Sequence, residues 1–244
     1  MSAIKESRIY QSFVLPLWLL GIIWGIHAMQ WLLGIRLGYL LGISPRETSG
    51  LIGVITSPLI HSDWGHLIAN TPPLFAMSVI ILFFYRSIAI PSFVLVYLLT
   101  GLSVWALAKD GYHIGASGVV YGLVSFVAWT GIFRRNLKSI VLALLVLFYY
   151  GSLFLGILPG QVEDNISWES HLMGGIVGIF VAFLYKDKKE KDEVKQKPSW
   201  ELEAPEEERS FLDPSTFEKT KIARERDRER GGNSDPWYQS NTWR

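Results

Sequence analysis

Six long runs of apolar residues follow one another along the chain, separated by short polar segments. A bilayer core of about 30 Å needs about 20 apolar helical residues, and most of the runs approach that length. The pattern therefore predicts an all-α polytopic membrane protein with six transmembrane helices, the fourth of them beginning near Ser117. The predicted spans are Phe13–Leu33, His66–Tyr85, Ser87–Ala108, Gly111–Phe133, Ile140–Leu158 and His171–Tyr185.

Two features of this pattern depart from a simple row of spanning helices. The segment Gly34–Ile60 is apolar but is broken by Pro45, Pro58 and several glycines, so we expect an interfacial first loop. A seventh span over Gly50–Ile60 is the alternative, but eleven residues are too few to cross a bilayer. The last run is short, which is tolerable where its polar end, His171, lines a water-filled cavity inside the protein.

The charged residues are distributed unevenly. Residues 1–185 hold 16 of the 45 Lys, Arg, Asp and Glu residues, and residues 186–244 hold the other 29. We therefore predict two parts, a membrane-embedded domain over 1–185 and a charged, disordered cytoplasmic tail over 186–244. Alternating charges over Phe217–Arg230 favour a transient helix within that tail.

Lysine and arginine near the ends of the spans predict the orientation of the chain, because these residues concentrate in cytoplasmic loops. Most of them fall on one side, which places both the amino and the carboxyl terminus in the cytoplasm. We expect a multi-pass protein of the bacterial plasma membrane. The residues that set this side are Lys5, Arg8, Arg86, Arg134, Arg135, Lys138, Lys186, Lys188 and Lys189.

Composition removes several classes of function. The net charge of +1 offers no excess of positive charge for nucleic acid, so we expect no nucleic-acid partner. The chain has no cysteine, which excludes disulfides and thiolate metal sites. No His-Glu-x-x-His motif occurs, and we expect neither a metal nor a cofactor.

Polar groups inside membrane spans are costly, so those that remain are candidates for function. Three groups lie at the predicted extracytoplasmic ends of three spans. They are His66 with Asn70, the run Gly115-Ala116-Ser117-Gly118, and His171 followed by Gly174 and Gly178.

This combination of side chains suits acyl transfer. A serine hydroxyl becomes a nucleophile when a histidine takes its proton, and Ser117 and His171 provide such a pair. Backbone N–H groups at the start of a helix, together with Asn70 and His66, could stabilise the oxyanion. No carboxylate lies within the spans to orient His171, so we expect a dyad.

Small residues give a packing reason for the two groups to meet. Gly118-x-x-x-Gly122 and Gly174-x-x-x-Gly178 are stripes of the kind that lets membrane helices approach closely. Tyr121 lies one turn after Ser117, where its ring could pack against the His171 imidazole.

The ordered motifs resemble the rhomboid family of intramembrane serine proteases over residues ~10–185, which implies a rhomboid-like helical bundle. The resemblance implies Ser117 as nucleophile, His171 as base, and Asn70, His66 and the Ser117 N–H around the oxyanion. It also implies transmembrane substrates with one span, cut at a small residue near the membrane surface. The motifs are His61-xxxx-His66-xxx-Asn70, Gly115-Ala116-Ser117-Gly118-xx-Tyr121 and His171-xx-Gly174-xxx-Gly178.

The sequence departs from the family at one point and leaves some roles open. Many members have a Trp-Arg pair before the first histidine where this chain has Ile52 and Gly53, and Arg46 is a candidate substitute in that loop. His61 could hold loop backbone or touch substrate, and His113, in the loop before Ser117, is interpreted as structural or solvated. The alternative function is a non-catalytic protein that binds transmembrane helices.

Overall fold

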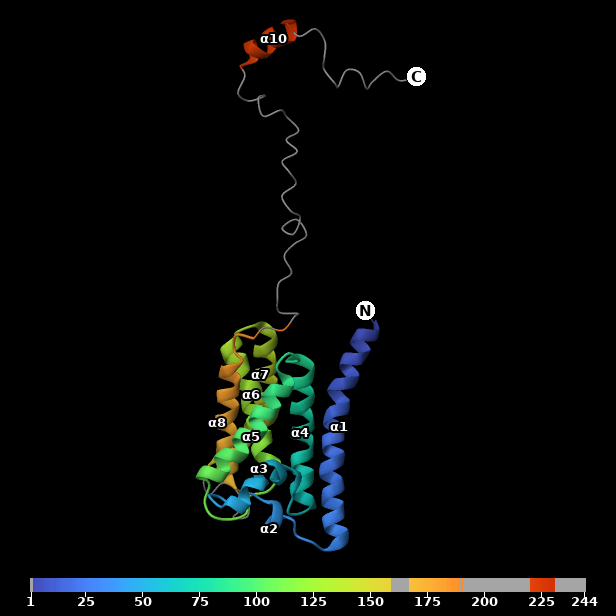
Figure 1. Ribbon diagram of the computed structural model, residues 1–244, viewed down its shortest axis with the longest axis vertical. Helices are drawn as coiled ribbons and strands as arrows, with labels where there is room; N and C mark the ends of the chain where they lie inside the picture. Colours follow the sequence, from blue (N-terminus) through green and yellow to red (C-terminus); the bar gives the residue numbers. More distant parts are fainter. Residues whose placement is uncertain (1, 159–166, 189, 191–219, 231–244) are drawn as a thin grey trace. The chain divides into compact units, whose positions relative to one another are not determined.

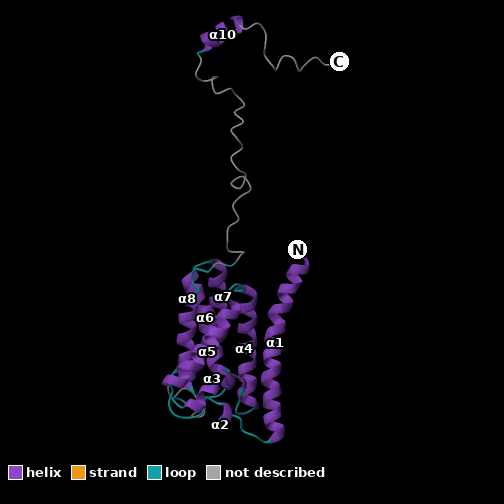
Figure 2. Ribbon diagram, viewed as in Figure 1, coloured by secondary structure: helices purple, strands orange, loops and turns teal. Residues whose placement is uncertain are grey.

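The computed structural model describes residues 2–158, 167–188, 190 and 220–230. These residues form α-helices and short 3-10 helices without a strand (Figure 2). One isolated bridge joins Ile43 to His113. The chain divides into two compact units, Met1–Val194 and Lys195–Arg244. The described part of the second unit, residues 220–230, contains α10 (Lys221–Arg230), which lies inside the segment for which the charge pattern favours a helix. The predicted disorder of the tail otherwise lies outside the described residues.

Four helices of the first unit are long and apolar enough to cross a membrane. They are α1 (Ser2–Leu33, with its apolar part over Ile9–Leu33), α4 (Trp64–Phe84), α5 (Ala89–Leu107) and α6 (Ser117–Arg134). Two further predicted spans are apolar but shorter, α7 (Leu137–Tyr150, 14 residues) and α8 (Trp168–Leu184, 17 residues). The fifth predicted run changes helix type at Gly151, where the 3-10 helix η3 (Gly151–Ile157) begins.

Helix α6 forms the centre of the bundle and is packed by α4, α5, α7 and α8 (Figure 1). Its apolar stretch is 72% buried inside the protein, whereas the corresponding value for α1 is 22%. Helix α1 packs mainly on α4 and leaves most of its own surface free of protein contacts. In a membrane the exposed apolar surface of α1 would face lipid, whereas α6, which begins at Ser117, is the most buried of the four long helices.

The predicted contact between the helices that carry Ser117 and His171 is confirmed. A Cβ atom on Gly174 would overlap the carbonyl oxygen of Gly118, and one on Gly178 would lie 2.9 Å from the backbone nitrogen of Phe126. On the other helix, a Cβ on Gly122 would lie 3.2 Å from the Gly174 carbonyl oxygen. Helices α6 and α8 therefore meet backbone to backbone, which larger residues at these positions would prevent.

Helix α4 begins at Trp64, two residues before the predicted start of its span. Asp63 is the N-cap, and its carboxylate accepts a hydrogen bond of 2.9 Å from the His66 backbone N–H. Hydrogen bonds from the Ser62 hydroxyl and then from that N–H lower the pKa of Asp63. The cap thus explains the earlier start, and it fixes the first turn that carries His66.

The first loop is built from short helical turns and does not form a seventh spanning helix. The turns are α2 (Gly38–Leu41), η1 (Thr48–Ile52), α3 (Gly53–Thr56) and η2 (Ser57–Leu59). The apolar stretch Thr48–Leu59 is shorter than a span. Its predicted place in the membrane interface stays a prediction.

Arg46 fastens this loop to the end of α5. Its backbone has a left-handed φ of 63°, and its N–H donates to the Trp105 carbonyl at 2.9 Å. The guanidinium donates to the Ala108 carbonyl at 2.6 Å and pairs with the Asp110 carboxylate. The loop is therefore anchored on the segment that leads from α5 toward Ser117. The anchoring residue is Arg46, which the sequence suggests as a candidate in this loop.

Candidate active site

The turn before Ser117 is held by contacts from three sides. Gly115 has a φ of +104°, which side-chain-bearing residues rarely adopt, and its N–H donates to the Ser57 carbonyl at 2.9 Å. A Cβ atom at this position would lie 2.7 Å from Nε2 of His66. The Ala116 N–H donates to Nε2 of His61 at 3.4 Å. Helix α6 then begins at Ser117, as the sequence predicts, so its first N–H groups have no partner within the helix.

His61 acts on the loop backbone in this structure. Its side chain is 2% exposed, and the cost of burying a charge, together with repulsion from His66 and His27, lowers its pKa to about 3. A neutral imidazole has one nitrogen that can accept a hydrogen bond, and here it accepts from Ala116. Of the two roles considered for His61, the geometry favours holding the turn that precedes Ser117.

His171 is held in one orientation by two neighbours that do not include a carboxylate. Its ring stacks on Tyr121, with centroids 4.1 Å apart and planes at 4°, which confirms the predicted packing of these two rings. Its Nδ1 lies 2.9 Å from the Gly156 carbonyl oxygen in η3. A carbonyl oxygen can only accept, so Nδ1 carries the hydrogen and Nε2 remains the basic nitrogen. Within the described part of the chain, Nε2 is buried and has no hydrogen-bond partner.

The Gly156 carbonyl could not be found from the sequence, because a backbone acceptor has no residue signature. The one indication in the sequence is that residue 156 is a glycine, which has no side chain. A Cβ on Gly156 would overlap the Tyr121 hydroxyl and lie 3.4 Å from His171 Nδ1. Glycine is therefore needed where η3 passes over the stacked rings.

The two predicted oxyanion side chains have other partners in this structure. The Asn70 amide nitrogen donates to the His66 carbonyl of its own helix at 2.9 Å, and the side chain is 7% exposed. His66 Nδ1 lies 3.2 Å from the Ser62 hydroxyl. Among the described residues, no hydrogen bond joins Ser117 to His171, Asn70 or His66.

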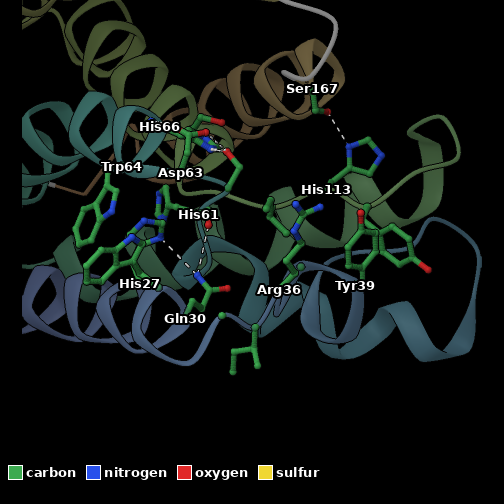
Figure 3. Close-up of a pocket in the computed structure, with 18 residues that line it drawn as sticks. His27, Gln30, Arg36, Tyr39, His61, Asp63, Trp64, His66, His113 and Ser167 are labelled. Carbon is green, nitrogen blue, oxygen red and sulfur yellow. Dashed lines mark hydrogen bonds between the residues drawn. The ribbon is translucent and has the colours of Figure 1, made fainter.

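Ser117 and His66 line a cavity of about 730 Å³ between the end of α1, the first loop and the turn before α6 (Figure 3). His61, His113 and Ser167 also line it, whereas His171, Asn70 and Tyr121 do not. The His171 backbone is nevertheless close to Ser117, because the neighbouring residues Gly118 and Ser170 touch. A Cβ on Gly118 would lie 3.1 Å from the Ser170 carbonyl oxygen.

No group of three or more His, Cys, Asp or Glu side chains arranged to hold a metal ion occurs within the described ranges. The four histidines that line the cavity are not such a group. His27 packs edge-on against Trp64 with ring centroids 4.5 Å apart, and His61 packs against His66 at 5.0 Å.

Comparison with known proteins decides the family. The model of the rhomboid domain matches residues 48–188, which contain the turn before Ser117, the glycine contact of α6 with α8, and His171. This chain belongs to the rhomboid family. Its apolar helices agree with a multi-pass integral membrane protein.

Relatives of this rhomboid occur in several bacteria. "Uncharacterized protein Rv1337" of Mycobacterium tuberculosis is 38% identical over 151 residues, 59% of this chain and 62% of that protein. "Uncharacterized protein ML1171" of Mycobacterium leprae is 34% identical over 151 residues, 59% of each chain. "Putative rhomboid protease YdcA" of Bacillus subtilis is 27% identical over 164 residues, 63% of this chain and 75% of that protein. The matched region thus spans about 60% of the mycobacterial relatives.

Proposed function

We propose that this rhomboid is an intramembrane serine endopeptidase in which Ser117 is the nucleophile and His171 the general base. The observation that carries the proposal is the hydrogen bond from His171 Nδ1 to the Gly156 carbonyl. This hydrogen bond leaves Nε2 as the basic nitrogen of His171. The helix that carries His171 contacts the helix of Ser117 at Gly118. The orienting role that an aspartate has in a catalytic triad would here belong to a backbone carbonyl.

The proposed reaction is acyl transfer in two halves. The Ser117 hydroxyl attacks the scissile carbonyl carbon while Nε2 of His171 takes its proton, and the same proton then passes to the leaving amine. Water hydrolyses the resulting ester in the second half with His171 again as base. The substrates we propose are proteins with a single transmembrane helix, cut near the extracytoplasmic surface.

The oxyanion would be stabilised by the Ser117 N–H and by the side chains of Asn70 and His66. Asn70 has a second amide hydrogen beyond the one that it gives to the His66 carbonyl. We expect Asn70→Ala to lower kcat by a factor on the order of 10²–10³, the usual loss for one oxyanion donor. Thr71→Val is the matched control, because the Thr71 hydroxyl likewise bonds the preceding turn, to Leu67, on another side of α4. Equal rates for the two variants would remove Asn70 from the oxyanion site.

We also propose six spanning segments with both termini in the cytoplasm of a bacterial cell. The support is the asymmetry of lysine and arginine between alternate loops, together with the four helices long enough to span and the shorter apolar helices α7 and α8. Reporter fusions at Arg135 and after Tyr185 should report cytoplasm, and one near Asp164 the opposite side. A cytoplasmic signal from Asp164 would contradict the topology.

The experiment that separates a protease from a helix-binding protein uses the full chain purified in detergent. A fluorophosphonate probe should label it at one site, and a panel of single-span substrates should include at least one that is cut. Labelling should map to Ser117 by peptide analysis, because the probe reacts with activated serines. A chain that binds spanning helices but neither labels nor cleaves would support the non-catalytic alternative.

A further inference from the structure

A second histidine links the two halves of the candidate site. His113 lies four residues before Ser117, and Ser167 lies four residues before His171. Nδ1 of His113 is 2.8 Å from the Ser167 hydroxyl, a contact drawn in Figure 3 between two elements that are distant in sequence. The bond therefore connects the loop before Ser117 to Ser167, the N-cap of the helix that carries His171.

The direction of this hydrogen bond follows from the other partner of the ring. Nε2 of His113 lies 2.9 Å from the Lys109 carbonyl oxygen, which can only accept, so Nε2 carries the hydrogen. In this tautomer Nδ1 accepts from the Ser167 hydroxyl, and another acceptor within reach of that hydroxyl, the Glu169 carboxylate, is farther away at 3.5 Å. The Ser167 hydroxyl donates its hydrogen to His113, and its oxygen accepts a hydrogen bond of 3.2 Å from the Ser170 backbone N–H. This second bond is the N-cap bond of α8.

Both ends of the link are fixed to the rest of the fold. His113 forms paired backbone hydrogen bonds with Ile43, 2.9 Å from its N–H and 3.0 Å to its carbonyl, and Ile43 is 3% exposed. Ser167 is fixed by capping the helix that packs on α6. A bond between two anchored points sets a distance, whereas a bond to a mobile side chain would not.

A parallel contact between the same two segments is weaker. Lys109 Nζ lies 4.0 Å from the Glu169 carboxylate, and its side chain is 79% exposed. An ion pair this exposed is screened by solvent and contributes little. The short, half-buried His113–Ser167 bond is thus the contact that can hold the loop and the helix at one spacing.

We propose that the hydrogen bond between His113 and Ser167 positions the catalytic pair, by setting the separation between the Ser117 loop and the start of the helix that carries His171. Both residues are positioning residues that need not touch the reacting atoms. The inference rests on the proposed function. Displacement of a reacting group by about 1 Å can cost a factor of 10² in rate, so one bond at this place has a large effect.

The test separates the two nitrogens of the imidazole. An asparagine amide occupies roughly the place of Nδ1 and a glutamine amide that of Nε2, so His113→Asn keeps a partner for Ser167 while His113→Gln loses it. Ser167→Gly removes the hydroxyl from the other side, and glycine is a tolerated N-cap. We expect His113→Gln, His113→Phe and Ser167→Gly each to lower kcat about 10- to 100-fold with little change in KM. We expect His113→Asn to recover most of the activity.

Coupling between the two residues provides the second measurement. The loss in a His113→Phe, Ser167→Gly double variant should equal that of either single variant, because both remove the same bond. Fluorophosphonate labelling, which requires no bound substrate helix, should slow by the same factor as cleavage. Lys109→Met, which removes the exposed parallel contact, and Asn136→Gly, which removes the N-cap of α7, are the matched controls and should stay close to wild type.

Several results would overturn the inference. Losses that multiply in the double variant, or His113→Asn as impaired as His113→Gln, would mean that the two residues do not act through their shared bond. Slow cleavage with unchanged labelling would assign His113 to substrate binding instead. Each of these leaves the proposed function intact, whereas full cleavage by Ser117→Ala would reject that function whatever the His113 variants do.

Discussion

Replacing Ser117 by alanine is expected to abolish both substrate cleavage and fluorophosphonate labelling. The hydroxyl at the start of α6 is the proposed nucleophile, and alanine leaves the turn formed by Gly115 and Ala116 unchanged. The variant should therefore fold, because the Ser117 hydroxyl makes no hydrogen bond within the described residues and the α6 backbone is unchanged. Loss of the covalent nucleophile removes the pathway itself and leaves only binding.

A serine farther along the same helix gives the matched control. Ser125 lies on α6, is 5% exposed, and donates from its hydroxyl to the Gly175 carbonyl of α8 at 2.8 Å. Ser125→Ala should cost about 0.5–1.5 kcal/mol of stability, the net worth of one hydrogen bond, and leave labelling intact. Robust cleavage by a folded Ser117→Ala protein would reject the serine mechanism.

Replacing His171 by alanine is expected to reduce cleavage and labelling almost as severely. Without Nε2 the Ser117 hydroxyl has no base, and its neutral form is a poor nucleophile. The double variant with Ser117→Ala should be no worse than Ser117→Ala alone, because the two residues act as one unit. In the wild type, activity should fall in acid, since a protonated imidazole cannot accept the serine proton.

Loss of the His171 ring also removes its stacking on Tyr121. Such an aromatic pair contributes about 0.5–1.5 kcal/mol to stability. Tyr121→Phe keeps that stacking and should stay active, and thermal unfolding of both variants would measure the structural part. If His171→Ala labelled at the wild-type rate, another group would have to be the base. Labelling rate is the decisive readout because it does not depend on how a substrate helix binds.

Features set by repeating patterns of side chains could be predicted from the sequence. The lengths of the apolar runs predicted the helices, and the spacing of Gly118, Gly122, Gly174 and Gly178 predicted that α6 and α8 would meet. The Tyr121 stacking followed from helical geometry, which places residues one turn apart on the same face. These are local or pairwise rules, and the tertiary structure agrees with them.

Features that depend on the backbone of a distant segment could not be predicted. The Gly156 carbonyl that orients His171 and the bond from His113 to Ser167 join loops whose paths no spacing reveals. Helix boundaries also shifted where caps intervened, as at Asp63 and Ser167. The roles assigned to Ser117 and His171 remain predictions until they are tested by substitution.

The missing Trp-Arg pair has a structural explanation in the first loop. A Cβ on Gly53 would overlap the backbone of Gly42 and Ile43, so no arginine could occupy this position without moving the loop. Arg46 instead reaches the end of α5 and bonds the Ala108 carbonyl and Asp110. In this chain Arg46, and not a residue at position 52 or 53, therefore anchors the first loop to the end of α5.

The glycine contact between α6 and α8 restricts the route by which a substrate can arrive. Sliding α8 by one residue along α6 would bring Val177 or Ile179 to the place of Gly178, where no side chain fits. The two helices consequently have a single register. For the proposed function, a spanning substrate is therefore expected to reach Ser117 from a side of the bundle that this pair does not close.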